Sequence, residues 1–128
     1  MLCAAFCLLS LSGCRVYTDE TALLAAGEIS SVRVFSQPDC YDCFYYGRHA
    51  APIVEYLNRL SLDPDFAEDP EDVNGMTIKI ILVYENGREL TLYHVGNSFI
   101  RAEYGVWYKM DYGEAVQLEE ILKEKQTA

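Results

Sequence analysis

Hydrophobic and polar residues alternate in two segments of the chain. In ISSVRVFS, residues 29–36, Val32 and Val34 share one face and Arg33 between them is polar. Alternation with a period of two is typical of a strand with one buried face. The segment MTIKIILVY, residues 76–84, has one apolar face and a second face that is partly apolar. It is the strongest strand pattern in the chain, so we expect it in the middle of a sheet.

Two other segments have a helical spacing of apolar residues. Ile53 and Leu57 begin a series that predicts a helix over residues 52–62, and Pro52 suits its first turn because no N–H is needed there. The segment GEAVQLEEILKEK, residues 113–125, has one apolar face and one charged face. It predicts an amphipathic helix that closes the domain.

Three dipeptides of turn composition divide the second half of the chain: Asn86-Gly87, Gly96-Asn97 and Tyr104-Gly105. Asn86-Gly87 predicts a hairpin, since a type I′ turn needs positive φ at both central positions. The resulting order of elements is strand, helix, four strands and helix. It predicts an α+β fold, a mostly antiparallel sheet of four to five strands with two helices packed on one face. We expect a single such domain over residues 29–125.

The chain carries 10 Lys and Arg against 20 Asp and Glu, a formal net charge of -10. This balance repels nucleic acid and anionic lipid head groups, so we expect neither as a partner. Six carboxylates lie between the first helix and the strongest strand: Asp63, Asp65, Glu68, Asp69, Glu71 and Asp72. A solvated loop accounts for them. Calcium binding is the alternative, although Ala67 stands where an EF-hand has its third ligand.

The first residues, MLCAAFCLLSLSGC, form an apolar run that is too short to span a bilayer and ends in small residues. This pattern predicts a signal peptide over residues 1–13. Its end, Leu11-Ser12-Gly13-Cys14, resembles the bacterial lipobox. The resemblance implies a lipid on Cys14, whose two acyl chains suffice for stable anchoring, and a tether over residues 14–28. A buried N-terminal helix that ends in a cysteine is the alternative.

Several turn and aromatic motifs occur in the second half of the domain: Asn86-Gly87, Gly96-Asn97 and Trp107-Tyr108-Lys109. With them, residues 29–125 resemble a group of small extracytoplasmic domains in Firmicutes lipoproteins whose role is unknown. The resemblance implies an α+β domain that is lipid-anchored on the extracytoplasmic face of the cell membrane. It carries no active site with it.

Cys40 and Cys43, in QPDCYDCFYYGRH, are the thiols that remain once Cys14 and the signal peptide are set aside. Because disulfides persist outside the cytoplasm, we expect a bridge between them that constrains a loop. A thioredoxin-like redox site is one alternative, since a strand, C-x-x-C and a helix follow one another, but no proline begins a later strand. A zinc site with His49 and His94 is another, although two distant histidines form no motif.

Four aromatic residues cluster around the cysteines: Tyr41, Phe44, Tyr45 and Tyr46. If they are exposed, they form a contact surface for a protein, peptide or glycan, since tyrosine offers rigid amphipathic area. If they are buried, they cover one end of the core. The pattern leaves both interpretations open.

The sequence lacks the common hydrolase and phosphate-binding motifs, and it has only two histidines for acid–base chemistry. These features favour a membrane-anchored surface lipoprotein that acts by binding rather than by catalysis. We expect no cofactor and no metal. A membrane-tethered thiol–disulfide oxidoreductase that uses Cys40 and Cys43 is the alternative function.

Overall fold

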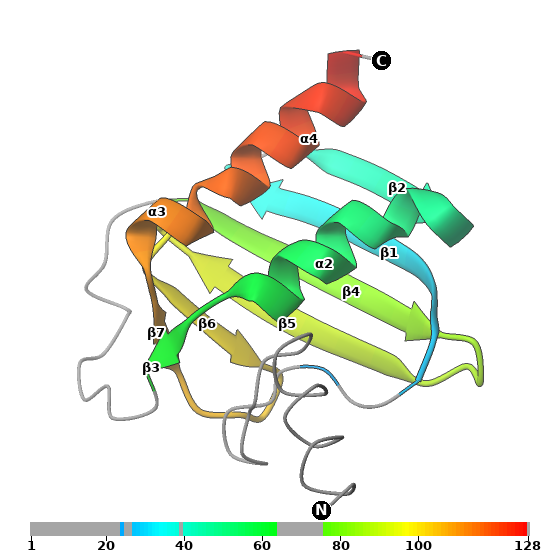
Figure 1. Cartoon of the computed structure of the whole chain (residues 1–128), viewed down its shortest axis with the longest axis horizontal. Helices are drawn as coiled ribbons and strands as arrows, with labels where there is room; N and C mark the ends of the chain where they lie inside the picture. Colours follow the sequence, from blue (N-terminus) through cyan, green and yellow to red (C-terminus); the bar gives the residue numbers. More distant parts are fainter. Residues whose placement is uncertain (1–23, 25–26, 39, 64–75, 128) are drawn as a thin grey trace, which may run out of the picture.

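The computed structural model describes residues 24, 27–38, 40–63 and 76–127, which form one sheet and its covering helices (Figure 1). The strands are β1 (Ile29–Gln37), β2 (Asp42–Tyr46), β3 (Leu62–Asp63), β4 (Thr77–Tyr84), β5 (Glu89–Val95), β6 (Phe99–Ala102) and β7 (Tyr108–Met110). The helices are the 3-10 turn η1 (Gly47–Ala50), α2 (Ala51–Arg59), α3 (Tyr112–Ala115) and α4 (Gln117–Thr127).

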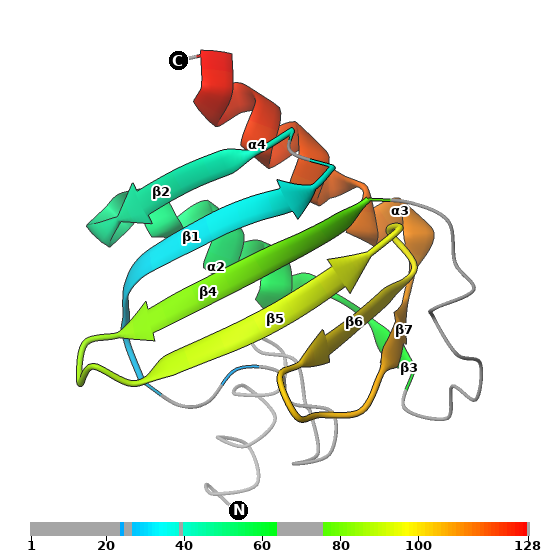
Figure 2. The same cartoon turned by 180° about the vertical axis from the view of Figure 1, so that it is seen from behind.

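The seven strands form one sheet in the order β2-β1-β4-β5-β6-β7-β3, and every neighbouring pair is antiparallel. Helices α2 and α4 lie across one face (Figure 1), and within the described residues no helix covers the other face, which we call the open face (Figure 2). The predicted α+β class and the placement of both helices on one face are confirmed. The predicted number of four to five strands is wrong.

The two additional strands are β2 and β3. The cysteine segment, predicted as a loop, forms β2 because Cys43 and Tyr45 turn inward while Phe44 and Tyr46 turn outward. The alternation cannot be recognised in the sequence, because the aromatic residues make both faces of the strand apolar. Strand β3 has two residues, which is too short for any periodic pattern.

The core lies between the sheet and the helices. Strand β4 lies between β1 and β5 in the interior of the sheet, as predicted, and every second residue of it is buried. From α2 the buried side chains are Ile53, Tyr56 and Leu57, and α4 contributes Leu118 and Leu122. Complete burial of one such side chain stabilises the fold by roughly 1.5–3 kcal/mol.

The predicted turns connect neighbouring strands, but their geometry differs from the expectation at one site. At Asn86-Gly87 only Gly87 has positive φ, 91°, so the loop is not the type I′ turn that we expected. Residues 84–87 at this hairpin are closed by a hydrogen bond from the Gly87 N–H to the Tyr84 oxygen and resemble a type I turn that ends in a glycine with positive φ. At Gly96 and Asn97 both φ values are positive, 59° and 56°, as a type I′ turn requires.

Both helices differ from the prediction at their ends. Helix α2 ends at Arg59, before the expected Leu62, because Leu60 is extended, with ψ of 133°, and leads into β3. The closing helix is divided at Val116 into α3 and α4. The Asp111 carboxylate begins α3 as its N-cap, since it accepts a hydrogen bond from the backbone N–H of Glu114 at 3.0 Å.

Candidate functional site

A row of aromatic and cationic side chains crosses the open face. The alternation that sends Val32 and Val34 into the core sends Arg33 and Phe35 to this face. Sheet register then brings side chains from neighbouring strands side by side, since Arg33 pairs with Phe44 and Phe35 pairs with Lys79. Its members, in spatial order, are Tyr46, Phe44, Arg33, Phe35, Lys79, Tyr93, Arg101 and Trp107. We call these eight residues the cation–aromatic row.

Each cation of the row lies between two rings. The guanidinium carbon of Arg33 lies 4.7 Å from the ring centre of Phe35 and 5.1 Å from that of Phe44. The ammonium of Lys79 lies 5.4 Å from the Phe35 ring centre and 5.8 Å from that of Tyr93. Contacts of this kind stabilise by about 0.5–1 kcal/mol each at exposed sites. They favour positions of the two cations between the rings.

The far end of the row repeats the pattern. The guanidinium carbon of Arg101 lies 4.6 Å from the ring centre of Tyr93 and 5.0 Å from that of Trp107. At the opposite end, Phe44 and Tyr46 stack with ring centres 5.9 Å apart and an interplanar angle of 8°. The row thus spans β2, β1, β4, β5 and β6 and reaches the residue before β7.

The positive charge of the row is only partly neutralised. The Nε atom of Arg33 lies 3.4 Å from the Asp42 carboxylate, and both side chains are partly exposed, so water screens the pair. Within the described part of the chain, neither Lys79 nor Arg101 forms an ion pair. One nitrogen of Arg101 donates to the backbone oxygen of Ala102 at 3.3 Å, and the other N–H groups of Arg101 and the Lys79 ammonium are available to an anion.

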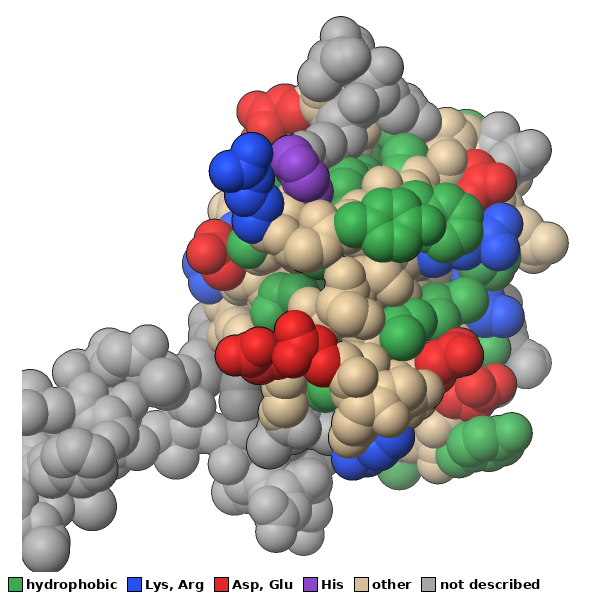
Figure 3. All heavy atoms as spheres, turned by 90° about the vertical axis from the view of Figure 1, so that its right-hand side faces the viewer, with side chains coloured by type: hydrophobic (Ala, Val, Ile, Leu, Met, Phe, Trp, Pro, Cys, Tyr) green, Lys and Arg blue, Asp and Glu red, His purple; other side chains and the backbone are tan. Residues whose placement is uncertain are grey.

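The middle of the row borders a hollow of about 230 Å³. Its lining comes from the end of β1, the start of β4 and Tyr93 of β5, and includes Phe35 and Lys79. Figure 3 shows the open face on the right, where exposed hydrophobic side chains stand beside Lys and Arg and also beside Asp and Glu. A hollow of this size is smaller than a typical drug-sized pocket, so it suits a ring or side chain of a larger ligand.

The four aromatic residues singled out in the sequence separate into two pairs. Tyr41 and Tyr45 are buried, with 7% and 2% of their surface exposed, and burial raises the pKa of Tyr45 above its usual range. Phe44 and Tyr46 are 56% and 62% exposed and belong to the row. Both interpretations of the cluster therefore hold, each for one pair.

The cysteines lie at the edge of the sheet. Cys40 is exposed in the β1–β2 connection, Cys43 is partly buried on β2, and no disulfide joins them in the structure. The bridge stays a prediction. Among the described residues no three His, Cys, Asp or Glu side chains gather as metal ligands. His94 is completely buried and hydrogen-bonded to Tyr56. The structure therefore does not form the alternative zinc site of Cys40, Cys43, His49 and His94.

Cys14 lies outside the described residues, and so does the acidic segment beyond Asp63. The structure therefore leaves the lipidation site and the calcium alternative as predictions. Within the described ranges, no helix combines the length and apolar character needed to cross a membrane.

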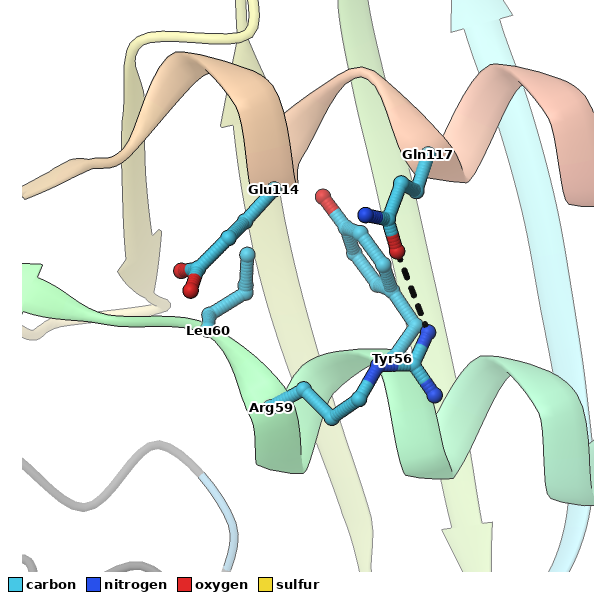
Figure 4. Close-up of a pocket in the computed structure, with 5 residues that line it drawn as sticks. All are labelled: Tyr56, Arg59, Leu60, Glu114 and Gln117. Atoms are coloured by element: carbon cyan, nitrogen blue, oxygen red, sulfur yellow. Dashed lines mark hydrogen bonds between the residues drawn. The ribbon is translucent and has the colours of Figure 1, made fainter.

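A second hollow, of about 210 Å³, lies between α2 and the α3–α4 segment (Figure 4). The ring of Tyr56 extends from α2 toward the other helix, and Arg59 donates to the Gln117 side chain at 3.4 Å beside it. The Glu114 carboxylate accepts from the backbone N–H and hydroxyl of Ser61. These groups are engaged in joining the helices, so we interpret this hollow as part of their packing.

Sequence reasoning missed most of the row. It identified Phe44 and Tyr46 but assigned no binding role to Arg33, Phe35, Lys79, Tyr93, Arg101 or Trp107. Their outward positions on the predicted strands could have been read from the alternation. The pairing across strands could not, because it depends on a sheet order that the sequence does not state.

Comparison with known proteins yields no family: no family model, no curated protein and no solved structure matches the chain. The function is therefore inferred from the site itself.

Proposed function

We propose that this protein is a non-catalytic binding domain whose ligand lies on the cation–aromatic row. The observation that carries the proposal is the uninterrupted alternation of rings and cations across five strands and the adjoining residue Trp107. Phe44 and Tyr46 keep more than half of their surface exposed, which costs free energy unless a ligand covers them. Rigid aromatic residues and arginine are the residue types that dominate binding energy at protein surfaces.

We further propose that the domain acts on the extracytoplasmic face of the cell membrane, held by a lipid on Cys14. The support is the lipobox-like end of the N-terminal run. Mass spectrometry of the membrane-extracted protein should find a mature chain that begins at Cys14 and carries the added mass of acyl chains. A chain that retains Met1 and an unmodified Cys14 would refute this part of the proposal.

The binding proposal is tested by cosedimentation of the full chain, kept in detergent, with bacterial envelope fragments from which the lipid has been extracted, so that a lipid on Cys14 cannot carry the protein down. The triple variant Phe44→Ser, Tyr46→Ser, Trp107→Ser should lose most of the sedimented protein, because it removes both ends of the row. The variant Tyr104→Ser is the matched control, since Tyr104 is 98% exposed and outside the row. Equal sedimentation of the triple variant and the wild type, with both folded by circular dichroism, would contradict the proposal.

The thiol–disulfide alternative has weaker support from the geometry. A redox-active C-x-x-C motif gains its reactivity at a helix N-terminus. Here Cys43 lies within β2, and α2 begins at Ala51. We expect no turnover in an insulin-reduction assay and unchanged envelope binding for Cys40→Ser with Cys43→Ser.

A further inference from the structure

We infer that the ligand of the cation–aromatic row is an acidic polysaccharide, such as a uronic-acid polymer, that lies across the strands. This inference rests on the proposed function and names its ligand class. Lys79, Tyr93 and Arg101 lie directly opposite one another on β4, β5 and β6, so two cations flank one ring in a straight line.

The spacing of the cations favours a polymer with separated charges. Lys79 and Arg101 are two strands apart, which places their backbones about 9.5 Å from each other. One disaccharide covers such a length, so a polysaccharide with at least one carboxylate in each disaccharide, as in a uronic-acid polymer, can place an anion at both cations. The sugar ring between the two carboxylates then lies against the outer edge of Tyr93, because Lys79 and Arg101 lie over the faces of this ring.

The two cations that flank Tyr93 favour an anionic ligand over a neutral one, and they outnumber the one carboxylate that the structure describes there, that of Glu103, which lies 3.5 Å from the Tyr93 hydroxyl. Lys79 and Arg101 form no ion pair within the described residues, and both are partly buried. A half-buried cation gains more from an anion than one in free solvent does, because the effective dielectric constant is lower. Hydrogen bonds to charged groups of this kind are also the stronger ones.

The same face disfavours the other polyanions. Strands β1, β4 and β5 are paired on both sides, so a peptide lying on them gains no backbone hydrogen bonds and must leave its own amides to water. Duplex nucleic acid carries one negative charge per about 1.7 Å, far more than three cations neutralise against a net protein charge of -10. A uronic-acid polysaccharide needs no backbone hydrogen bonds from the sheet and has a lower charge density than duplex nucleic acid.

Titration with polygalacturonate fragments, followed by the fluorescence of Trp107, tests the inference, since Trp107 is the one tryptophan of the chain and contacts Arg101. Lys79→Gln and Arg101→Gln should each weaken binding by at least about tenfold. Two variants that remove the same charges from the helix side, Lys123→Gln and Arg48→Gln, should bind as the wild type does. Arg101→Lys should bind with intermediate affinity, because it keeps the charge and loses the planar guanidinium.

The competing ligands are probed with the same proteins. Methyl-esterified polygalacturonate of equal length should bind at least about tenfold more weakly, because it lacks the carboxylates. Equal binding of the ester, or tighter binding of polyglutamate or of oligothymidylate, would overturn the polysaccharide inference. If that other ligand is lost in the row variants, the proposed function still stands. No binding of polygalacturonate also overturns the inference, and the envelope test then decides the proposed function independently.

Discussion

Among single residues, the buried His94 is the one for which the hydrogen bonds identify the ring nitrogen that carries the proton. The hydroxyl of Tyr56 donates to the backbone oxygen of Ala115 at 2.9 Å and lies 2.7 Å from Nε2 of His94. Because a carbonyl only accepts, the hydroxyl proton is committed to Ala115, and Nε2–H of His94 must be the donor to Tyr56. Burial lowers the pKa of His94 to about 4, so the ring is neutral at pH 7 and carries its one proton on Nε2.

The depressed pKa of His94 predicts that stability falls on acidification. The unfolded chain takes up this proton below pH 6.5 and the folded protein only near pH 4, so the stability present above pH 6.5 is lost progressively between these values. The total loss is about 3 kcal/mol, of which about 1.4 kcal/mol occurs between pH 7.5 and 5.5. Urea unfolding across this range measures it. His94→Gln should remove this loss, and an unchanged pH dependence in that variant would contradict the assignment.

Tyr56 should be important for stability because its hydroxyl joins three elements. Tyr56→Phe leaves the Ala115 oxygen and the Nε2–H of His94 without this partner in a buried environment. We expect a loss of about 1–3 kcal/mol in the free energy of unfolding, measured by urea titration. Tyr112→Phe is the matched control, since Tyr112 is 65% exposed, and it should change stability by less than about 0.5 kcal/mol. Equal effects of the two variants would show that the hydroxyl contributes nothing.

At the scale of elements, periodicity predicted what long regular segments determine by themselves. Strand β4, its hairpin with β5 and the amphipathic helices follow from local spacing. Strand β2 could not be predicted in this way. Its inward side chains, Cys43 and Tyr45, are similar in polarity to its outward ones, Phe44 and Tyr46. The end of α2 was misplaced because Leu60 continues the helical spacing while its backbone is already extended.

The candidate site was the least predictable feature for a related reason. A row across a sheet takes one or two residues from each strand, and neighbours in space are far apart in sequence. Phe35 meets Lys79 only because β1 pairs with β4, although β2 follows β1 in the chain. A single sequence contains the residues of the row but not the strand order that aligns them.

The β4–β5 hairpin depends on the backbone freedom of Gly87. Its φ is 91°, and a Cβ atom there would meet nothing within 4 Å, so substitution imposes backbone strain without a steric clash. Gly87→Ala should therefore destabilise the protein by about 1–2 kcal/mol in thermal or urea unfolding. Gly113→Ala in α3 is the control and should be neutral or stabilise by up to about 1 kcal/mol. If Gly87→Ala left the stability unchanged, the hairpin would not depend on a glycine with positive φ at this position.

At the scale of the whole molecule, two electrostatic effects of opposite sign act on an anionic ligand. The net charge of -10 repels it over long distances, while the cations of the row attract it at contact. Long-range repulsion between exposed charges is screened strongly by salt, since the Debye length falls from about 30 Å at 0.01 M to about 8 Å at 0.15 M. Contacts between partly buried groups are screened less.

Raising the salt concentration from 0.01 M to 0.15 M should therefore increase the association rate constant for polygalacturonate, because the repulsive field shrinks before the ligand reaches the row. The dissociation rate constant should rise more modestly, because the contacts of Lys79 and Arg101 are partly buried. Stopped-flow measurement of Trp107 fluorescence separates the two rates. In the double variant Lys79→Gln, Arg101→Gln, salt should still increase the association rate constant, but it should change the dissociation rate constant less than in the wild type. Association that slows as salt rises would mean instead that the row, not the net charge, governs the approach of the ligand.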